Sequence, residues 1–306
     1  MPPLGARIHL NPFLVHRSHC LIAALVLTSC APARDGCEPH GESLALHDDV
    51  REASGIAASR EHDDVLWVHN DSEGGAVVFA IGTSGELLGR VTLRGAHNRD
   101  WEDIAVGRCP AGGPEQDCLY LADIGDNRAA REAIGIWVAP EPQPHDQEIV
   151  EVGFIRMRYP DGPRDAEAIA VLPDGSLVIV TKGREHPVSV YRSGPLQWPT
   201  EPEHKAALTL VQRLSAEPVS LPDQITGSGA DRDGRIAVRS YASLQFYRFD
   251  GDSLLSLLGE PVRLDSLGEP QGEGVALARR GRVYLVSEAG PQGIAPRLTP
   301  LRCRLP

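Results

Sequence analysis

Apolar and polar residues along most of this chain form short runs that suit β-strands better than helices. Five runs are rich in apolar and β-branched residues, at positions 65–70, 119–123, 177–181, 236–240 and 283–287. Turn-forming Pro, Asp and Gly separate several strands, as at positions 173–175 and 233–234. The pattern predicts an all-β fold.

A line of sequence that repeats five times precedes these runs. Its first copy is Arg51-Glu52-Ala53-Ser54-Gly55-Ile56-Ala57, and the others occupy residues 99–105, 164–170, 225–230 and 270–276. The copies start about 45 to 65 residues apart, the size of one four-stranded propeller blade with its loops. Third strands are expected at 77–81, 135–139, 188–192 and 244–249, and fourth strands at 87–93, 150–157, 207–214 and 261–264.

Four strands per repeat predict a β-propeller. Five blades are preferred, and six are possible if a segment between repeats hides a degenerate blade. The last repeat has no visible fourth strand after residues 297–305, and residues 43–47 could supply it and close the ring. A tandem β-sandwich is the alternative.

The first thirty residues have the pattern of an export signal. A weakly basic start precedes an apolar run that is too short to span a bilayer. The run ends Leu27-Thr28-Ser29-Cys30, which resembles the lipobox of bacterial lipoproteins. The resemblance implies a signal peptide over residues 1–29, a lipidated Cys30 with a linker over 30–42, and a propeller over 43–306. Ala31 after the cysteine implies outer-membrane sorting in Gram-negative bacteria, and an ordinary signal peptide is the alternative.

The remaining cysteines suit an oxidising compartment such as the cell envelope. Cys109 and Cys118 bracket a loop, and a disulfide there would staple two strands. Cys37 and Cys303 would then join the two ends of the mature chain and lock the ring. Zinc binding is the alternative, although the chain has no CxxC pair.

The formal net charge of −12 and the lack of long basic runs disfavour binding to nucleic acid. The acidic balance is compatible with metal cations near the surface. Because a closed ring leaves no free sheet edge, a monomer that contacts the membrane only through its lipid is expected.

One position of the repeat carries hydroxyls and carboxylates. Equivalent positions of successive blades point toward one axis, so these side chains should meet at one end of the central channel. Carboxylates in one pocket repel unless a positive charge lies between them. Calcium, which binds six to eight oxygens, would meet that need, whereas zinc fits worse without His or Cys. The candidate ligands are Ser54, Glu102, Glu167, Glu273 and, in the fourth repeat, Thr226 or Ser228.

Arginines precede this position by three residues in the first three repeats, at Arg51, Arg99 and Arg164. They would either clamp an anion or pair with the acidic residues beside them. Lys182, Arg184 and Arg239 could add to either role. His69 and His97 are candidate acid-base groups, or are simply solvated.

Residues 101–106, 119–127 and 272–275 resemble strands of calcium-dependent apyrases. That family consists of five-bladed propellers with a channel calcium held by Ser and Glu, and its members hydrolyse nucleoside di- and triphosphates. The resemblance implies that Ser54, Glu102, Glu167 and Glu273 are calcium ligands. The substrate-binding segments of apyrases have no match, which puts nucleotidase activity in doubt. The blades also resemble secreted phytase-like and TolB-like propellers, which implies fold and not activity.

Three functions are open. The first is a metal-dependent hydrolase of a phosphorylated or otherwise anionic small molecule, acting on a phosphoric ester or anhydride. In it, Glu167 or His69 would act as base, and Arg99 and Arg164 would hold the anion. The second is a non-catalytic propeller that binds an envelope protein or a glycan. The third, glycoside hydrolysis, is disfavoured because aromatic residues make up 5% of the chain.

Overall fold

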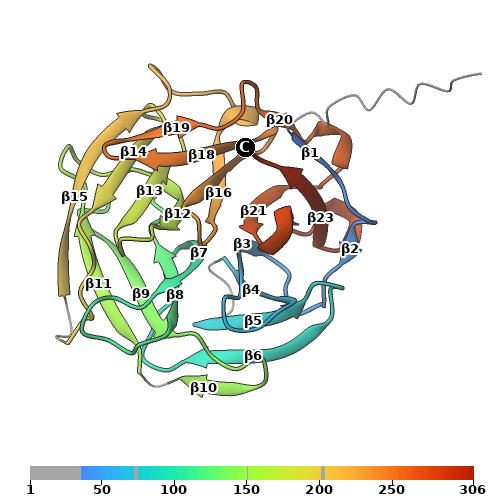
Figure 1. Cartoon of the computed structure of the whole chain (residues 1–306), viewed down its shortest axis with the longest axis horizontal. Coiled ribbons are helices and arrows are strands. Elements are labelled where there is room, and N and C mark those ends of the chain that lie inside the picture. Colours follow the sequence, from blue (N-terminus) through green and yellow to red (C-terminus); the bar gives the residue numbers. More distant parts are fainter. Residues whose placement is uncertain (1–35, 72–74, 150, 201–203) are drawn as a thin grey trace, which may run out of the picture. The chain divides into compact units, whose positions relative to one another are not determined.

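The computed structural model describes residues 36–71, 75–149, 151–200 and 204–306 (Figure 1). The expected signal peptide and Cys30 lie outside these residues. Residues Asp35–Pro306 form one compact unit. Within the described residues, no helix has the length and apolar character needed to cross a membrane.

Each repeat opens with an inner strand that lies next to the inner strands of its neighbours. Every inner strand contacts the next along the chain, and the last contacts the first, so five strands form a closed circuit in the described part of the chain. Such strands are buried on both faces, which explains their small and apolar sequences. The circuit is the arrangement expected of five blades, although the blade count stays a prediction. The inner strands are β3 (Ala53–Ala58), β7 (Trp101–Arg108), β12 (Ala166–Val171), β16 (Ile225–Ala230) and β21 (Gly272–Leu277).

The next two strands of each repeat continue the sheet outward in antiparallel fashion. They lie within a residue or two of the sequence prediction, because each run of apolar residues is bounded by turn residues. The second strands are β4 (Val65–Asn70), β8 (Asp117–Asp123), β13 (Leu177–Thr181), β17 (Arg235–Ser240) and β22 (Arg282–Ser287). The third strands are β5 (Val77–Gly82), β9 (Ile134–Pro140), β14 (Ser189–Ser193), β18 (Ser243–Asp250) and β23 (Arg297–Arg304).

The outer edges are less regular than the pattern predicts. Strands β11 (Gly153–Arg158) and β15 (His204–Arg213) pair in parallel, which joins the second and third repeats into one eight-stranded sheet. Strand β10 (Gln147–Ile149) pairs in parallel with β6 (Leu87–Leu93), the outer strand of the first repeat. In the fourth repeat β19 (Ser253–Ser256) takes most of the outer edge, and β20 (Val262–Arg263) covers only part of the strand predicted at 261–264. The reason is a tight turn at Gly251, with φ of 61°, that folds the chain straight back onto β18.

Strands from the two ends of the described chain close the ring. Strand β1 (Gly36–Pro39) and strand β2 (Leu44–Ala45) both pair with β23, and they complete the sheet of the last repeat (Figure 1). The predicted closure by an N-terminal strand is therefore confirmed. The first strand of the propeller begins earlier in the chain than expected. Strand β1 lies within residues 30–42, where the sequence predicted a linker.

Both predicted disulfides are present. Cys37 and Cys303 are directly opposite in the β1–β23 pairing, so the bond locks the closing seam. Cys109 and Cys118 are bonded across the β7–β8 connection. The Cys37–Cys303 bond joins residues 266 apart in sequence, so it restricts the unfolded chain strongly, by about 5–6 kcal/mol in the loop-entropy model.

The core lies between neighbouring sheets. Trp67 of β4 and Trp101 of β7 are fully buried in one cluster between the first two repeats. Full burial of an apolar side chain contributes about 2–3 kcal/mol, so these faces fix how the blades stack. In the described part of the chain, four short 3-10 helices occur in loops, at η1 (Leu221–Asp223), η2 (Asp265–Leu267), η3 (Arg279–Gly281) and η4 (Pro291–Gly293).

Candidate functional site at the carboxylate mouth

The repeat position that carries carboxylates lies near the start of every inner strand. All five side chains there are buried, and each lies at a local shift in the pairing with the second strand. Such β-bulges re-aim side chains, which is how one sequence position in each blade turns toward its neighbours. We call this end of the ring the carboxylate mouth. Its members are Ser54, Glu102, Glu167, Thr226 and Glu273.

The predicted convergence of carboxylates is present. The Glu102 and Glu167 carboxyl groups lie close enough to affect each other electrostatically. Like charges this close favour the protonated form of at least one of them. Burial, followed by repulsion from Glu167, raises the pKa of Glu102 well above its usual range. Burial raises the pKa of Glu167 to about 7, even though a nearby lysine opposes the shift.

That lysine is Lys182, which follows the end of β13. Its ammonium group donates a hydrogen bond to Glu167 Oε1, and only 9% of its side chain is exposed. Although burial works against the charge, attraction to Glu167 raises the pKa of Lys182. The protein therefore supplies one positive charge among the carboxylates itself.

Two more carboxylates have raised pKa values: Glu273, a member of the carboxylate mouth, and its neighbour Glu288. Burial and repulsion from Glu167 raise the pKa of Glu273 to about 8. Burial and repulsion from Asp71 raise the pKa of Glu288, just after β22, to about 7. Both groups can therefore exchange protons near neutral pH, which is what acid-base catalysis requires. Glu288 is only half-buried, so it is the more accessible of the two.

At this end of the ring, the carboxylates that are spaced to hold a cation are a partly different set from the predicted ligands. Oxygens of Asp71, Asp100 and Glu102 lie within 4.8 Å of one another. Gly125 lies directly beneath them, because a Cβ on this glycine would be 2.1 Å from Glu102 Oε1 and 2.5 Å from Asp100 Cγ. The donors are all carboxylate oxygens, which suit a hard cation such as calcium or magnesium.

Three predicted metal ligands have other partners. Ser54 Oγ donates to the Glu102 backbone oxygen at 2.9 Å. Glu167 binds Lys182, and Glu273 Oε1 accepts from Gln271 Nε2 at 2.8 Å. Glu102 is thus the one predicted ligand that belongs to the described carboxylate cluster.

The prediction of His69 as a catalytic base does not fit its surroundings. Its side chain is fully buried, edge-on to Trp101, and Nδ1 lies 2.9 Å from the Asn70 backbone oxygen. Burial lowers the pKa of His69 to about 4. The imidazole packs over Gly55, whose missing side chain makes room for it. His69 is therefore a neutral core residue without access to a ligand.

The three arginines predicted to bind an anion differ in availability. Arg164 is held by its own loop, where it pairs with Asp161 at 3.0 Å and donates to the Pro163 oxygen at 2.7 Å. Arg99 is exposed and lines a pocket of about 440 Å³ beside Asp100. Arg51 is exposed and donates to the Asp48 backbone oxygen. Only Arg99 keeps a place beside the carboxylate cluster.

Asp103 is the central residue that sequence reasoning missed. Its carboxylate accepts backbone N–H groups from Ile104 at 2.9 Å, Ile169 at 2.8 Å and Ser228 at 3.1 Å. It thereby connects the inner strands of the second, third and fourth repeats. Complete burial raises the pKa of Asp103 well above its usual value. The available clue was its place next to Glu102 in the repeat.

No protein-family model and no curated protein matches the chain. Among solved structures, the PQQ-bound aldose sugar dehydrogenase of Streptomyces coelicolor is similar, with a TM-score of 0.50, 13% identity and coverage of 89% of this chain and 99% of that one. The allergen Mala s 1 of Malassezia sympodialis gives a TM-score of 0.52 with 10% identity, over 86% of this chain and 96% of the other. A calcium-binding protein, regucalcin, of Agrobacterium tumefaciens gives 0.43 with 14% identity, over 83% and 78%. The first two likenesses support the propeller fold and nothing finer.

Proposed function

We propose that this chain is an exported, lipid-anchored propeller of the bacterial cell envelope that binds calcium at the carboxylate mouth and hydrolyses an anionic small molecule, such as a phosphoric ester or anhydride. The observation that carries the proposal is the cluster of Asp71, Asp100 and Glu102 beside carboxyl groups with pKa values near 7. Strongly perturbed acids beside a candidate cation site are typical of catalytic centres.

The cluster would hold the cation, and the neighbouring residues would handle protons. Calcium, when bound, would act as a Lewis acid toward an anionic substrate. Glu288 is half-buried at the rim, and its pKa of about 7 allows it to give or take a proton in neutral solution. Arg99, exposed beside Asp100, is placed to attract a negatively charged group. Glu167 and Lys182 would hold the buried side of the site in place.

The test combines metal analysis with turnover. Protein purified without chelator should contain bound calcium, and it should release phosphate from a panel of phosphate esters only when calcium is present. Glu288→Gln should lower turnover at least tenfold while circular dichroism shows an unchanged fold. Glu260→Gln, an exposed residue distant in sequence, is the matched control. Metal-free protein whose melting and turnover do not respond to calcium would refute the proposal.

A non-catalytic binding module for an envelope protein or glycan is the second candidate. The observation that favours it is Lys182, since a cation supplied by the protein already offsets one of the buried carboxylates. In that case calcium would be dispensable. The protein would show no turnover on any ester, with or without the metal.

A further inference from the structure

The opposite end of the ring has a second pocket, which no part of the proposed function uses. Its volume is about 270 Å³, and it is lined by the segments that follow β3, β16 and β21. These strands start at the carboxylate mouth and are six residues long. At about 3.3 Å per residue, the two sites are roughly 17 Å apart.

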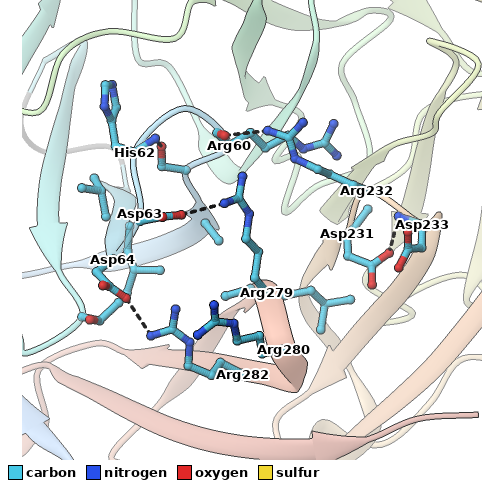
Figure 2. A pocket seen from close by; sticks show the side chains of 18 of the residues that line it. Arg60, His62, Asp63, Asp64, Asp231, Arg232, Asp233, Arg279, Arg280 and Arg282 are labelled. Atoms are coloured by element: carbon cyan, nitrogen blue, oxygen red, sulfur yellow. Dashed lines mark hydrogen bonds and ion pairs between the residues drawn. The ribbon is translucent and has the colours of Figure 1, made fainter.

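Arginine dominates this pocket, although the chain as a whole is acidic. Six arginines and four aspartates line it, together with His62. Figure 2 shows Arg60 and Arg232 on one side, Arg280 and Arg282 on the other, and Arg279 between them. We call this surface the arginine pocket.

The arginines come from equivalent turns. The connection between the first and second strands carries Arg60 in the first repeat, Arg232 in the fourth, and Arg279 and Arg280 in the fifth. These three repeats are neighbours in the ring, since β21 contacts both β16 and β3. The corresponding turns of the second and third repeats, residues 109–116 and 172–176, contain no arginine. Positive charge is thus gathered where adjacent blades meet.

Arg280 is available to a ligand. It is exposed, and no other described residue forms a hydrogen bond or an ion pair with its guanidinium group. Its backbone is left-handed, with φ of 62° and ψ of 31°, and Gly281 follows at φ 71°. This turn favours Asn, Asp or Gly, so turn chemistry does not explain an arginine there. The backbone of Arg280 is therefore strained, and no contact of its side chain within the described protein compensates for that strain.

The other arginines have acidic partners, and these pairs differ in exposure. Arg235 is held by two aspartates of the pocket, Asp231 at 2.7 Å and Asp233 at 3.0 Å. Arg279 pairs with Asp63 and Arg282 with Asp64, but most of both aspartates is exposed, so these pairs are weak. Arg60 and Arg232 both contact Asp117, at 3.6 Å and 3.2 Å, and oxygens of Glu61, Asp117 and Glu141 lie within 4.8 Å of one another, so these two positive charges are offset by nearby carboxylates. An incoming anion can exchange with the exposed Asp63 or Asp64, next to Arg280.

We propose that the arginine pocket is a binding site for a small phosphate-bearing molecule. Guanidinium groups match the geometry of phosphate oxygens and bind them in pairs. Arginines approaching from several sides suit a tetrahedral group with two negative charges better than a planar carboxylate. The inference stands on residues remote from the carboxylate mouth, so it does not depend on the proposed hydrolysis.

Calorimetric titration of the purified chain with inorganic phosphate and with glycerol 3-phosphate tests the site. EDTA is present throughout, which prevents phosphate from binding through a metal at the carboxylate mouth. Both ligands should bind, and acetate at the same concentration should bind more weakly. Failure of both to bind in EDTA, or equal binding of acetate, would overturn the proposal.

Arg280→Asn is the decisive variant because asparagine suits the left-handed turn, so the fold is kept while the charge is lost. It should weaken phosphate binding about tenfold or more. Arg213→Gln removes one exposed charge at the end of β15, outside the pocket, and should leave the affinity unchanged. A substitution on β23 is unsuitable as this control, because Arg302 is opposite the pocket residue Arg282. Equal affinity in Arg280→Asn and the unmodified protein, or an equal loss in Arg213→Gln, would show that phosphate binds elsewhere.

Discussion

At one end of the ring the inner strands begin among buried carboxylates, and at the other end three of them run into turns rich in exposed arginine. The carboxylates lie close together, with raised pKa values and one lysine between them. The arginines spread over a wider pocket, where the partners of Arg279 and Arg282 are largely exposed to solvent. The difference follows from position in the repeat: strand starts converge inside the ring, and strand connections lie at its surface. Placing charge at the carboxylate mouth therefore costs more free energy than placing it at the arginine pocket.

The largest effect should come from Lys182→Met, which removes the buried ammonium group that pairs with Glu167 and leaves that carboxylate without its partner. Breaking a buried ion pair costs about 3–5 kcal/mol, so the free energy of unfolding at pH 7 should fall by that amount. Arg279→Gln, in an exposed pair at the other mouth, should cost less than about 1 kcal/mol. Urea denaturation measures both. Similar losses of unfolding free energy in the two variants would mean that ion pairs contribute equally at the carboxylate mouth and at the arginine pocket.

Stability should also depend on pH in a direction set by the carboxylate mouth. The folded-state pKa values of Glu167, Glu273 and Glu288 lie at about 7, 8 and 7, above the ordinary value of 4.5. Between these values the folded state binds more protons than the unfolded state, so their stabilising contribution is present at low pH and is lost as pH rises toward 8. Each extra proton gives a slope of about 1.4 kcal/mol per pH unit.

This slope is measured by urea denaturation between pH 6.5 and 8.5. Below that range the buried His69, with its pKa lowered to about 4, opposes the trend, because the unfolded state then binds the additional proton. Glu273→Gln should flatten the slope and stabilise the protein at pH 8. Arginine substitutions at the other mouth should leave the slope unchanged, since guanidinium groups do not titrate there. Glu102 and Asp103, whose pKa values are also raised, leave part of the slope in place. A slope that Glu273→Gln, Glu167→Gln and Glu288→Gln together do not reduce would contradict this account.

A smaller effect on stability is expected from Gly125→Ala. The new methyl group would overlap Glu102 and Asp100, so the cluster must open. We expect calcium affinity to fall about tenfold or more, with a loss of about 1–3 kcal/mol in the free energy of unfolding. Gly194→Ala is the matched control, since its added Cβ would meet nothing within 4 Å. Calcium titration by calorimetry measures the affinity, and unchanged binding in Gly125→Ala would remove this cluster as the cation site.

The carboxylate mouth could be predicted from the sequence better than the arginine pocket, for a physical reason. Ser54, Glu102, Glu167 and Glu273 were recognisable because rotational symmetry makes one repeat position converge. Lys182 was harder to place, because its role depends on how close the end of β13 comes to Glu167. Asp103 was missed because adjacent side chains of a regular strand point to opposite faces. The bulge beside Glu102 lets both residues reach the neighbouring inner strand.

Features without symmetry could not be read from the pattern. His69 was predicted to be an acid-base group or a solvated side chain, yet the space over Gly55 that buries it arises only when β4 packs between two neighbours. The parallel pairing of β11 with β15 joins the outer edges of two repeats, which no periodicity within one repeat encodes. The arginine pocket likewise depends on which blades are adjacent after the ring closes.

The smallest expected effect concerns the competition between Asp63 and an anion for Arg279. Asp63→Asn keeps the size of the side chain but removes its charge, so Arg279 becomes free to turn toward the pocket. Because the exposed pair is worth less than about 1 kcal/mol, phosphate affinity should rise by no more than about fivefold. Calorimetry in EDTA measures the change, and Asp252→Asn at an exposed turn controls for net charge. A decrease would mean that Asp63 organises the pocket rather than competing with its ligand, so that the two mouths would share the need for a built-in counter-charge.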